Sequence, residues 1–128
     1  MSRNNIVLWV RDMLMKQKEL TIVNDQYRMP TYVKTLAKVC VEVLEKQQTG
    51  IFNVSSTKLL SIYDIAQQIA ETFNLNQDLI KPISSKALGQ RAKRPLVTGF
   101  DLTKTQAAFH VKLKTFKEDL QCFKEKLT

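Results

Sequence analysis

The chain alternates between segments of helical periodicity and short apolar runs. In five segments apolar residues recur at three- and four-residue steps, the spacing of amphipathic helices. These segments span residues 4–18, 31–46, 61–73, 101–109 and 115–127. Ser61 and Asp64 have the spacing of a capping box at the start of the third segment, with Asp in place of the usual Glu. Asn4 or Asn5 is the expected N-cap of the first segment.

The second predicted helix follows Pro30, whose fixed φ suits a turn or a helix start. Thr31 is the expected N-cap, and the helix is expected to continue to Lys46. Apolar residues at helical spacing predict one buried stripe along it. The stripe comprises Val33, Leu36, Ala37, Cys40, Val43 and Leu44. We therefore expect Cys40 to be a small core residue.

Short runs of aliphatic and β-branched residues between the helices predict strands. They span residues 20–23, 51–54 and 79–83. Pro82 has no amide hydrogen to donate, so the last run is expected at a sheet edge or a strand end. Residues 84–98 are polar and basic and include Gly89 and Pro95, which predicts mostly loop. Few strands beside several amphipathic helices predict an α/β domain with helices packed on a small sheet.

Composition narrows the classes of function. The 128 residues carry a net charge of +8 and are 44% hydrophobic, which fits one globular domain over residues 1–128. No apolar run reaches the roughly 18 residues of a membrane span, and no nucleic-acid-binding motif accompanies the lysines. Neither a membrane nor nucleic acid is therefore an expected partner. Two distant cysteines and a lone His110 predict a reduced, cytoplasmic protein without a metal site.

The sequence contains no recognisable set of catalytic residues. Its three glycines lack the spacing of a dinucleotide-binding or phosphate-binding loop. It has no HExxH or GxSxG motif, and no Tyr is followed four residues later by Lys. The Tyr-x-x-x-Lys pair that many reductases use for proton transfer is therefore absent. The residues by themselves indicate a binding or packing domain, and we assign no catalytic residue.

Four segments, taken in order, resemble one family. They read LTIVNDQYRMPTYVKTLAKVC, GIFNVSSTKLLSIYDIAQQIAETF, KPISSKALGQRAKRPLVTGFDLTKT and KLKTFKEDLQCF. Their order and spacing resemble dTDP-4-dehydrorhamnose reductase, within the extended short-chain dehydrogenase/reductase superfamily. The regulatory beta subunit of methionine adenosyltransferase shares the pattern. The chain departs from the family at Arg28 and Met29, where a Gly and a small residue are usual, and at Thr35, where Asp is common.

The resemblance covers nearly the whole chain but only the C-terminal part of the family. It implies a helix-rich substrate-binding subdomain with a few short strands, packed on an NAD(P)-binding Rossmann half that is absent here. That half would precede Met1, bind NADPH or NADH, and supply the Tyr-x-x-x-Lys pair. The implied function is the substrate-binding region of an NADPH-dependent reductase of dTDP-L-rhamnose biosynthesis, inactive alone. The implied partners are a nucleotide-sugar substrate, the Rossmann half and a second copy in a homodimer.

Two other functions remain open. One is a non-catalytic regulatory or interaction module like the methionine adenosyltransferase beta subunit. The other is part of a nucleotide-sugar epimerase or dehydratase, although those enzymes usually carry Arg-Asp where this chain has Asp25-Gln26. If the chain is a C-terminal half, it should expose apolar surface that normally meets the Rossmann half. We therefore expect the isolated chain to self-associate or to be marginally stable.

The resemblance also implies four substrate-binding residues. Gln26, Arg28 and Thr31 lie in the turn between the first strand and the second helix, which would face the substrate cleft. Arg94, directly before Pro95, occupies the place of an arginine that contacts the diphosphate in related sugar-nucleotide enzymes. A planar guanidinium is well suited to a diphosphate. Each residue also has a structural interpretation, as a helix cap, a turn residue or a solvated surface arginine.

Overall fold

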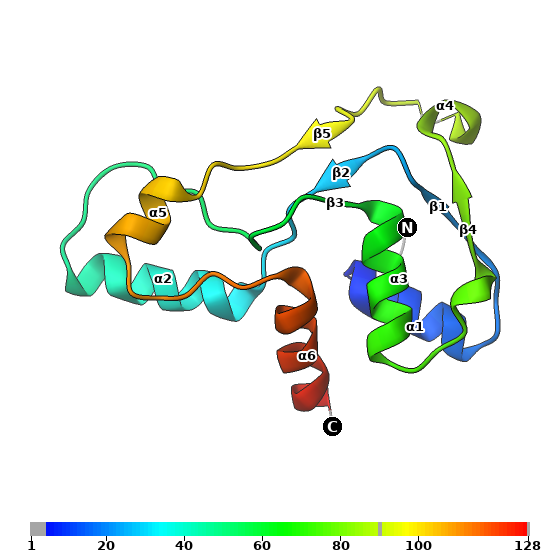
Figure 1. Ribbon diagram of the computed structural model, residues 1–128, viewed down its shortest axis with the longest axis horizontal. Helices are drawn as coiled ribbons and strands as arrows, with labels where there is room; N and C mark the ends of the chain where they lie inside the picture. Colours follow the sequence, from blue (N-terminus) through cyan, green and yellow to red (C-terminus); the bar gives the residue numbers. More distant parts are fainter. Residues whose placement is uncertain (1–4, 90, 128) are drawn as a thin grey trace.

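The protein is a mixed α/β chain with several helices and short strands (Figure 1), and its computed structural model describes residues 5–89 and 91–127. The helices are α1 (Ile6–Met15), α2 (Val33–Glu45), α3 (Ile62–Thr72), α4 (Ser85–Leu88), α5 (Thr103–Ala108) and α6 (Phe116–Leu127). A single 3-10 turn, η1, spans Gln77–Leu79. The strands are β1 (Leu20–Val23), β2 (Tyr27–Arg28), β3 (Leu60–Ser61), β4 (Ile80–Ile83) and β5 (Val97–Thr98). The predicted fold class is confirmed.

The described strands form two small sheets. β1 pairs in parallel with β4, and Leu20 lies opposite Ile80. In the second sheet β2 lies between β3 and β5, antiparallel to β3 and parallel to β5. Pro82 sits in β4, which has β1 as its only described neighbour, so the predicted edge position is confirmed.

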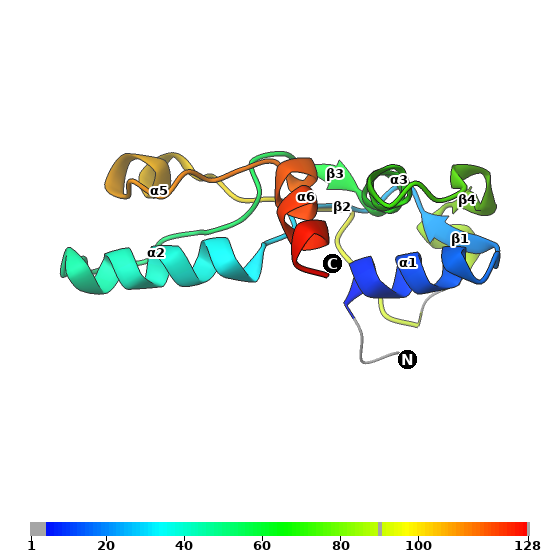
Figure 2. The same cartoon turned by 90° about the horizontal axis from the view of Figure 1, so that it is seen from below.

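The molecule is elongated. Figures 1 and 2 show α1, α3, β1 and β4 at one end, α2 and α5 at the other, and α6 between them. Each end has its own buried apolar cluster. The larger cluster contains Val10, Leu14, Leu20, Ile22, Ile65, Ala66, Ile69, Ala70, Ile80, Phe116 and Leu120. The smaller one joins α2 to α5 through Val39, Leu102, Phe109 and Leu113.

Local capping signals are borne out at three helix starts. Asn5 caps α1 by accepting a hydrogen bond from the Leu8 amide at 3.0 Å, while Asn4 lies outside the described residues. The Ser61 hydroxyl accepts from the Asp64 amide at 2.9 Å, and Asp64 accepts in return from the Ser61 amide at 3.2 Å. The reciprocal pair of Thr115 and Glu118 is present at the start of α6.

The N-cap prediction for Thr31 is wrong. α2 begins at Val33 after Tyr32, and its start has no side-chain cap. The Thr31 hydroxyl instead donates to the carbonyl of Val54 at 3.1 Å. Because that bond reaches a segment 23 positions away, local sequence could not reveal it.

The predicted strand over residues 51–54 does not form. The segment makes no backbone–backbone hydrogen bond to any described residue, although its side chains alternate between exposed and half-buried as in a strand. Side-chain donors satisfy three of its carbonyl groups. The pairs are Lys104 Nζ with Ile51, Thr105 Oγ1 with Asn53, and Thr31 Oγ1 with Val54. A strand needs a neighbour, and none of the described strands lies beside this segment.

The predicted buried stripe of α2 is also wrong, apart from the half-buried Val43. Val33 is 69% exposed, Leu44 is 77% exposed, and Cys40 is exposed rather than in the core. The buried residues of α2 are instead Val39 and Glu42. α2 carries apolar residues on two sides, and periodicity alone does not tell which side meets the rest of the chain.

Glu42 explains which side of α2 faces inward. Its carboxylate accepts from the backbone amides of His110 and Val111 at 2.7 and 3.0 Å and pairs with Lys46 at 2.9 Å. The amide bond from His110, followed by the Lys46 contact, lowers the pKa of Glu42 to about 2. These contacts fasten α2 to the connection between α5 and α6.

Residues 84–98 are mostly loop, as predicted, but contain two short elements that the sequence did not indicate. α4 occupies Ser85–Leu88, and β5 occupies Val97–Thr98. Of the helices in the part of the chain that the structure describes, none has both the length and the apolar character needed to cross a bilayer.

Candidate functional site

The turn between β1 and β2 is fastened to the start of α4. Asp25 accepts hydrogen bonds from the Ser85 amide at 2.9 and 3.0 Å and from the Ser85 hydroxyl at 2.6 Å. The hydroxyl bond, with the amide bond behind it, holds the pKa of Asp25 below its ordinary value. Asp25 is therefore an ionised anchor that fixes the turn.

Gln26 is buried at the centre of this turn, with 2% of its surface exposed. Its amide nitrogen donates to the Ser85 hydroxyl at 2.8 Å, and its amide oxygen accepts from Arg28 Nη2 at 3.3 Å. Its backbone carbonyl accepts from the amide of Ile62 at the start of α3. Gln26 thus joins three separate parts of the chain, the role of a positioning residue.

The Arg28 guanidinium binds the segment that leads into β5. Nη2 donates to the carbonyl of Pro95 at 2.9 Å, and Nη1 donates to the carbonyls of Tyr27 and Leu96 at 2.6 and 3.3 Å. Tyr27 adds a backbone bond from its amide to the carbonyl of Leu96. An always-charged fork bridging several carbonyls is a rigid attachment. Arg28 therefore fixes the backbone on the C-terminal side of Arg94.

Arg94 is exposed and makes no hydrogen bond or ion pair with a described residue. Its neighbour Pro95 is held by Arg28, so the base of the Arg94 side chain is fixed while its guanidinium is available. Arg91 and Lys93 are also exposed in this segment. Such a group of cations beside a rigid backbone is suited to an anion such as a phosphate.

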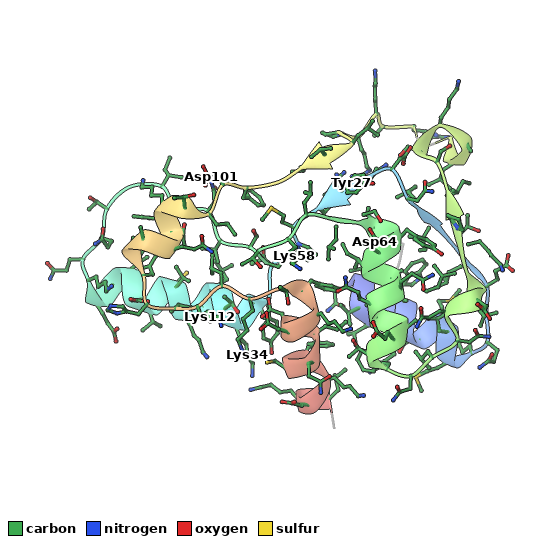
Figure 3. The ribbon with its side chains drawn as sticks, viewed as in Figure 1. Tyr27, Lys34, Lys58, Asp64, Asp101 and Lys112 are labelled. Carbon is green, nitrogen blue, oxygen red and sulfur yellow. The ribbon has the colours of Figure 1, made fainter. Side chains whose placement is uncertain are left out.

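Exposed apolar side chains lie beside this cluster. Tyr27 of β2 is paired with Val97 of β5, and both are exposed. Figure 3 labels Tyr27 on β2, at the upper edge of the molecule in that view. Phe100, two residues beyond β5, is exposed as well. An apolar surface next to cations can receive the ring portions of a ligand whose charged portion meets the arginines.

The structure brings three of the four predicted residues into one region. Gln26 and Arg28 are directly bonded, and Arg94 adjoins the residue that Arg28 holds. No hydrogen bond between described residues links Thr31 to this cluster, because its hydroxyl faces Val54.

Sequence reasoning missed Ser85, which lies at the centre of the cluster. It is 59 positions from Gln26, so spacing along the chain gave no indication of the contact. The one local signal is Ser84, whose hydroxyl accepts from the Ala87 amide and begins α4.

No group of three or more possible metal ligands is present within residues 5–89 and 91–127. Nor does any described loop have the glycine spacing that cradles a dinucleotide. The cluster can therefore bind and orient an anionic ligand, and the described residues offer no set for proton or hydride transfer.

Comparison with known proteins places this geometry in a family. The family model described as the RmlD substrate binding domain matches residues 1–128. The dTDP-4-dehydrorhamnose reductase of Aggregatibacter actinomycetemcomitans is 28% identical over 129 residues, covering 92% of this chain and 44% of that protein. Methionine adenosyltransferase 2 subunit beta of Pongo abelii is 36% identical over 87 residues, covering 63% of this chain and 25% of that protein.

A solved structure has the same fold. The dTDP-4-dehydrorhamnose reductase of Bacillus anthracis, in complex with NADP, superposes with a TM-score of 0.89 at 24% identity, covering 98% of this chain and 44% of that one. This chain thus spans less than half the length of the relatives it matches. Because the family model matches from end to end, the chain belongs to the RmlD substrate-binding domain family.

Proposed function

We propose that residues 1–128 form a single substrate-binding subdomain of an NADPH-dependent dTDP-4-dehydrorhamnose reductase, which serves dTDP-L-rhamnose biosynthesis in the cytoplasm. The observation that carries the proposal is the attachment of Arg28 to the Pro95 carbonyl. It fixes the segment that bears Arg94 and leaves the Arg94 guanidinium available beside an apolar surface. A nucleotide sugar has the matching chemistry, since its diphosphate is anionic and its base and sugar present flat faces.

In this proposal Arg94 binds the diphosphate, and Arg28 and Gln26 position the segment that carries it. Arg91 and Lys93 add positive potential that attracts the anion. Thr31 is the weakest member of the site. Its hydroxyl already donates its single proton to Val54, so toward a ligand it can only accept a hydrogen bond.

The nicotinamide cofactor, NADPH or NADH, would be held by a separate nucleotide-binding half and not by this chain. The described residues contain no glycine-rich loop for a dinucleotide, in line with that assignment. The cofactor supplies hydride to the sugar ketone when it is bound there. This chain alone would be inactive, because it has no Tyr-x-x-x-Lys pair.

A second candidate function is a regulatory or interaction module. The similarity to methionine adenosyltransferase beta subunits favours it, because a module of that kind needs the fold but not the chemistry. The two candidates differ in the Arg94 segment: the reductase requires a sugar nucleotide there, and the regulatory module does not. The resemblance to epimerases and dehydratases extends to the fold alone, at 16–19% identity.

The test is a comparison of Arg94→Ala with Lys112→Ala in the protein as it occurs in its cells. Both variants remove one positive charge, but Figure 3 shows Lys112 between α5 and α6, away from Tyr27 and β2. Arg94→Ala should raise the KM for the sugar nucleotide about tenfold or more, since hydrogen bonds to charged groups contribute about 1.5–3 kcal/mol. NADPH binding should not change. Equal KM values for the two variants would remove Arg94 from the site.

A further inference from the structure

α2 is attached to the rest of the chain by only one of its two apolar sides. Val39 is buried against Leu102 and Phe109, and Val43 is half-buried in the same cluster. The remaining inward contact is the polar attachment of Glu42. This inner side is small for a helix of 13 residues.

The other side, the outer face of α2, is apolar and exposed. It consists of Val33, Leu36, Ala37, Cys40 and Leu44, which follow one another at three- and four-residue steps. At 100° per residue, Leu44 lies about 140° around the helix from the buried Val39. In Figure 2, α5 lies above α2 and no described element lies below it. No described residue therefore covers the outer face.

Charged residues of α2 avoid the outer face. Lys34, Lys38 and Glu45 lie along a separate stripe at steps of four and seven residues, and Glu42 points inward. A solvated helix face would carry such residues itself. The segregation indicates that the outer face packs against protein.

A hollow continues the outer face at the N-terminal end of α2. It has a volume of about 340 Å³ and lies between the starts of α1, α2 and α6. Val33 belongs to both features, and the walls include Ile6, Phe116 and Phe123. Asp119 also lines it, is almost fully buried, and has one carboxylate oxygen without a hydrogen-bond partner among the described residues. An occupant with apolar groups and one donor would complete this hollow.

We propose that the outer face of α2 and this hollow form the docking surface for the nucleotide-binding half of the reductase. The inference rests on the proposed function for its choice of partner. More than half of the Bacillus anthracis reductase chain lies outside the matched part, so a body of sufficient size exists in that relative. The outer face itself is uncharged on a chain of net charge +8, which argues against nucleic acid or an anionic membrane as its occupant. A second copy of this chain is the competing occupant.

Cys40 provides a probe in the centre of the outer face. Its thiol is exposed in this chain, and thiol alkylation depends on access. The test compares Cys40 alkylation by iodoacetamide in two samples: the native gene product, purified from its cells without denaturation, and residues 1–128 expressed alone. Cys122 serves as the internal reference. We expect Cys40 in the native assembly to react at least about tenfold more slowly, because alkylation then requires local opening.

Variants on α2 locate the interface. Leu36→Glu with Leu44→Glu should restore fast Cys40 alkylation in the native assembly, because burying unpaired carboxylates is strongly unfavourable. Lys34→Glu with Lys38→Glu places the same groups on the charged stripe and should leave Cys40 protected. Equal Cys40 rates in the two wild-type samples would overturn the proposal without any variant. Protection that also appears in residues 1–128 alone and is lost on dilution would assign the face to a second copy, which equally overturns it.

The inference and the proposed function fail separately. dTDP binding to the same native assembly, measured by calorimetry, reports on the substrate site. If Cys40 is protected and dTDP does not bind, the docking surface stands and the reductase assignment fails. If dTDP binds and Cys40 is freely alkylated, the docking surface is wrong and the reductase assignment stands.

Discussion

Arg28 Nη2 donates a hydrogen bond to the carbonyl of Pro95 at 2.9 Å, across 67 positions of the chain. This bond makes one unit of β2 and the segment before β5. It also means that the residue next to Arg94 is held by another arginine. The candidate site is thus a tertiary construction and not a flexible basic loop.

Arg28→Ala should weaken sugar-nucleotide binding without any direct contact to the ligand. We expect a KM increase of about tenfold in the intact protein, since misplaced binding groups lose much of their effect. Hydrogen exchange of the Leu96–Thr98 amides should accelerate in the same variant. Arg11→Ala is the matched control, because Arg11 pairs only with the adjacent Asp12 among the described residues. An Arg28→Ala variant with unchanged exchange would show that the guanidinium does not hold this segment.

Glu42 should make the attachment of α2 dependent on pH. Its pKa is lowered to about 2 from an ordinary 4.5, so its contribution to stability is fully present above pH 4.5 and is lost as the pH falls towards 2. Glu42→Gln should lower the Tm at pH 7, and the difference from the unmodified chain should shrink through this window. Thermal melts at several pH values measure it. A difference between the two proteins that persists unchanged at pH 2 would contradict the assignment.

The packing of α6 against α1 and α3 should dominate the stability of the larger cluster. Leu120 is 1% exposed there, and truncating a buried Leu leaves a cavity. Leu120→Ala should therefore reduce the free energy of unfolding by about 2–5 kcal/mol in urea denaturation. Leu127→Ala in the same helix removes the same atoms from a side chain that is 44% exposed, and should cost well under half as much. Equal losses would show that α6 does not pack as described.

Residues 1–128 expressed alone should self-associate or melt at low temperature. The outer face of α2 then meets water, and Leu44 is 77% exposed. Sedimentation velocity over a range of concentrations measures the association. Leu36→Glu with Leu44→Glu should make the isolated chain more monomeric, although the same pair disrupts the native assembly. A monomeric wild-type chain with a cooperative, high-temperature melt would refute this expectation.

Local features of the fold were predictable from sequence, and features that depend on distant neighbours were not. The capping box of Ser61 and Asp64 and the strand β1 were foreseen, because each depends on residues close in the chain. The orientation of α2 was not, because Glu42 binds backbone amides 68 and 69 positions away. Residues 51–54 have the pattern of a strand, but pattern cannot supply the neighbour that a strand requires.

The candidate site followed the same division. The Asp25–Gln26 turn and the Arg94–Pro95 pair were found through their resemblance to a family. Their connection through Arg28 and Ser85 emerged only from the folded chain, since no spacing rule links positions this far apart.

The most direct test of the central claim is NADPH oxidation by the native assembly in the presence of dTDP-4-dehydrorhamnose. The account predicts oxidation that depends on the sugar nucleotide, with an increased KM in Arg94→Ala and an unchanged KM in Lys112→Ala. An assembly that contains this chain, binds NADPH and yet shows neither sugar-nucleotide-dependent oxidation nor dTDP binding would contradict the account, and the regulatory function would take its place.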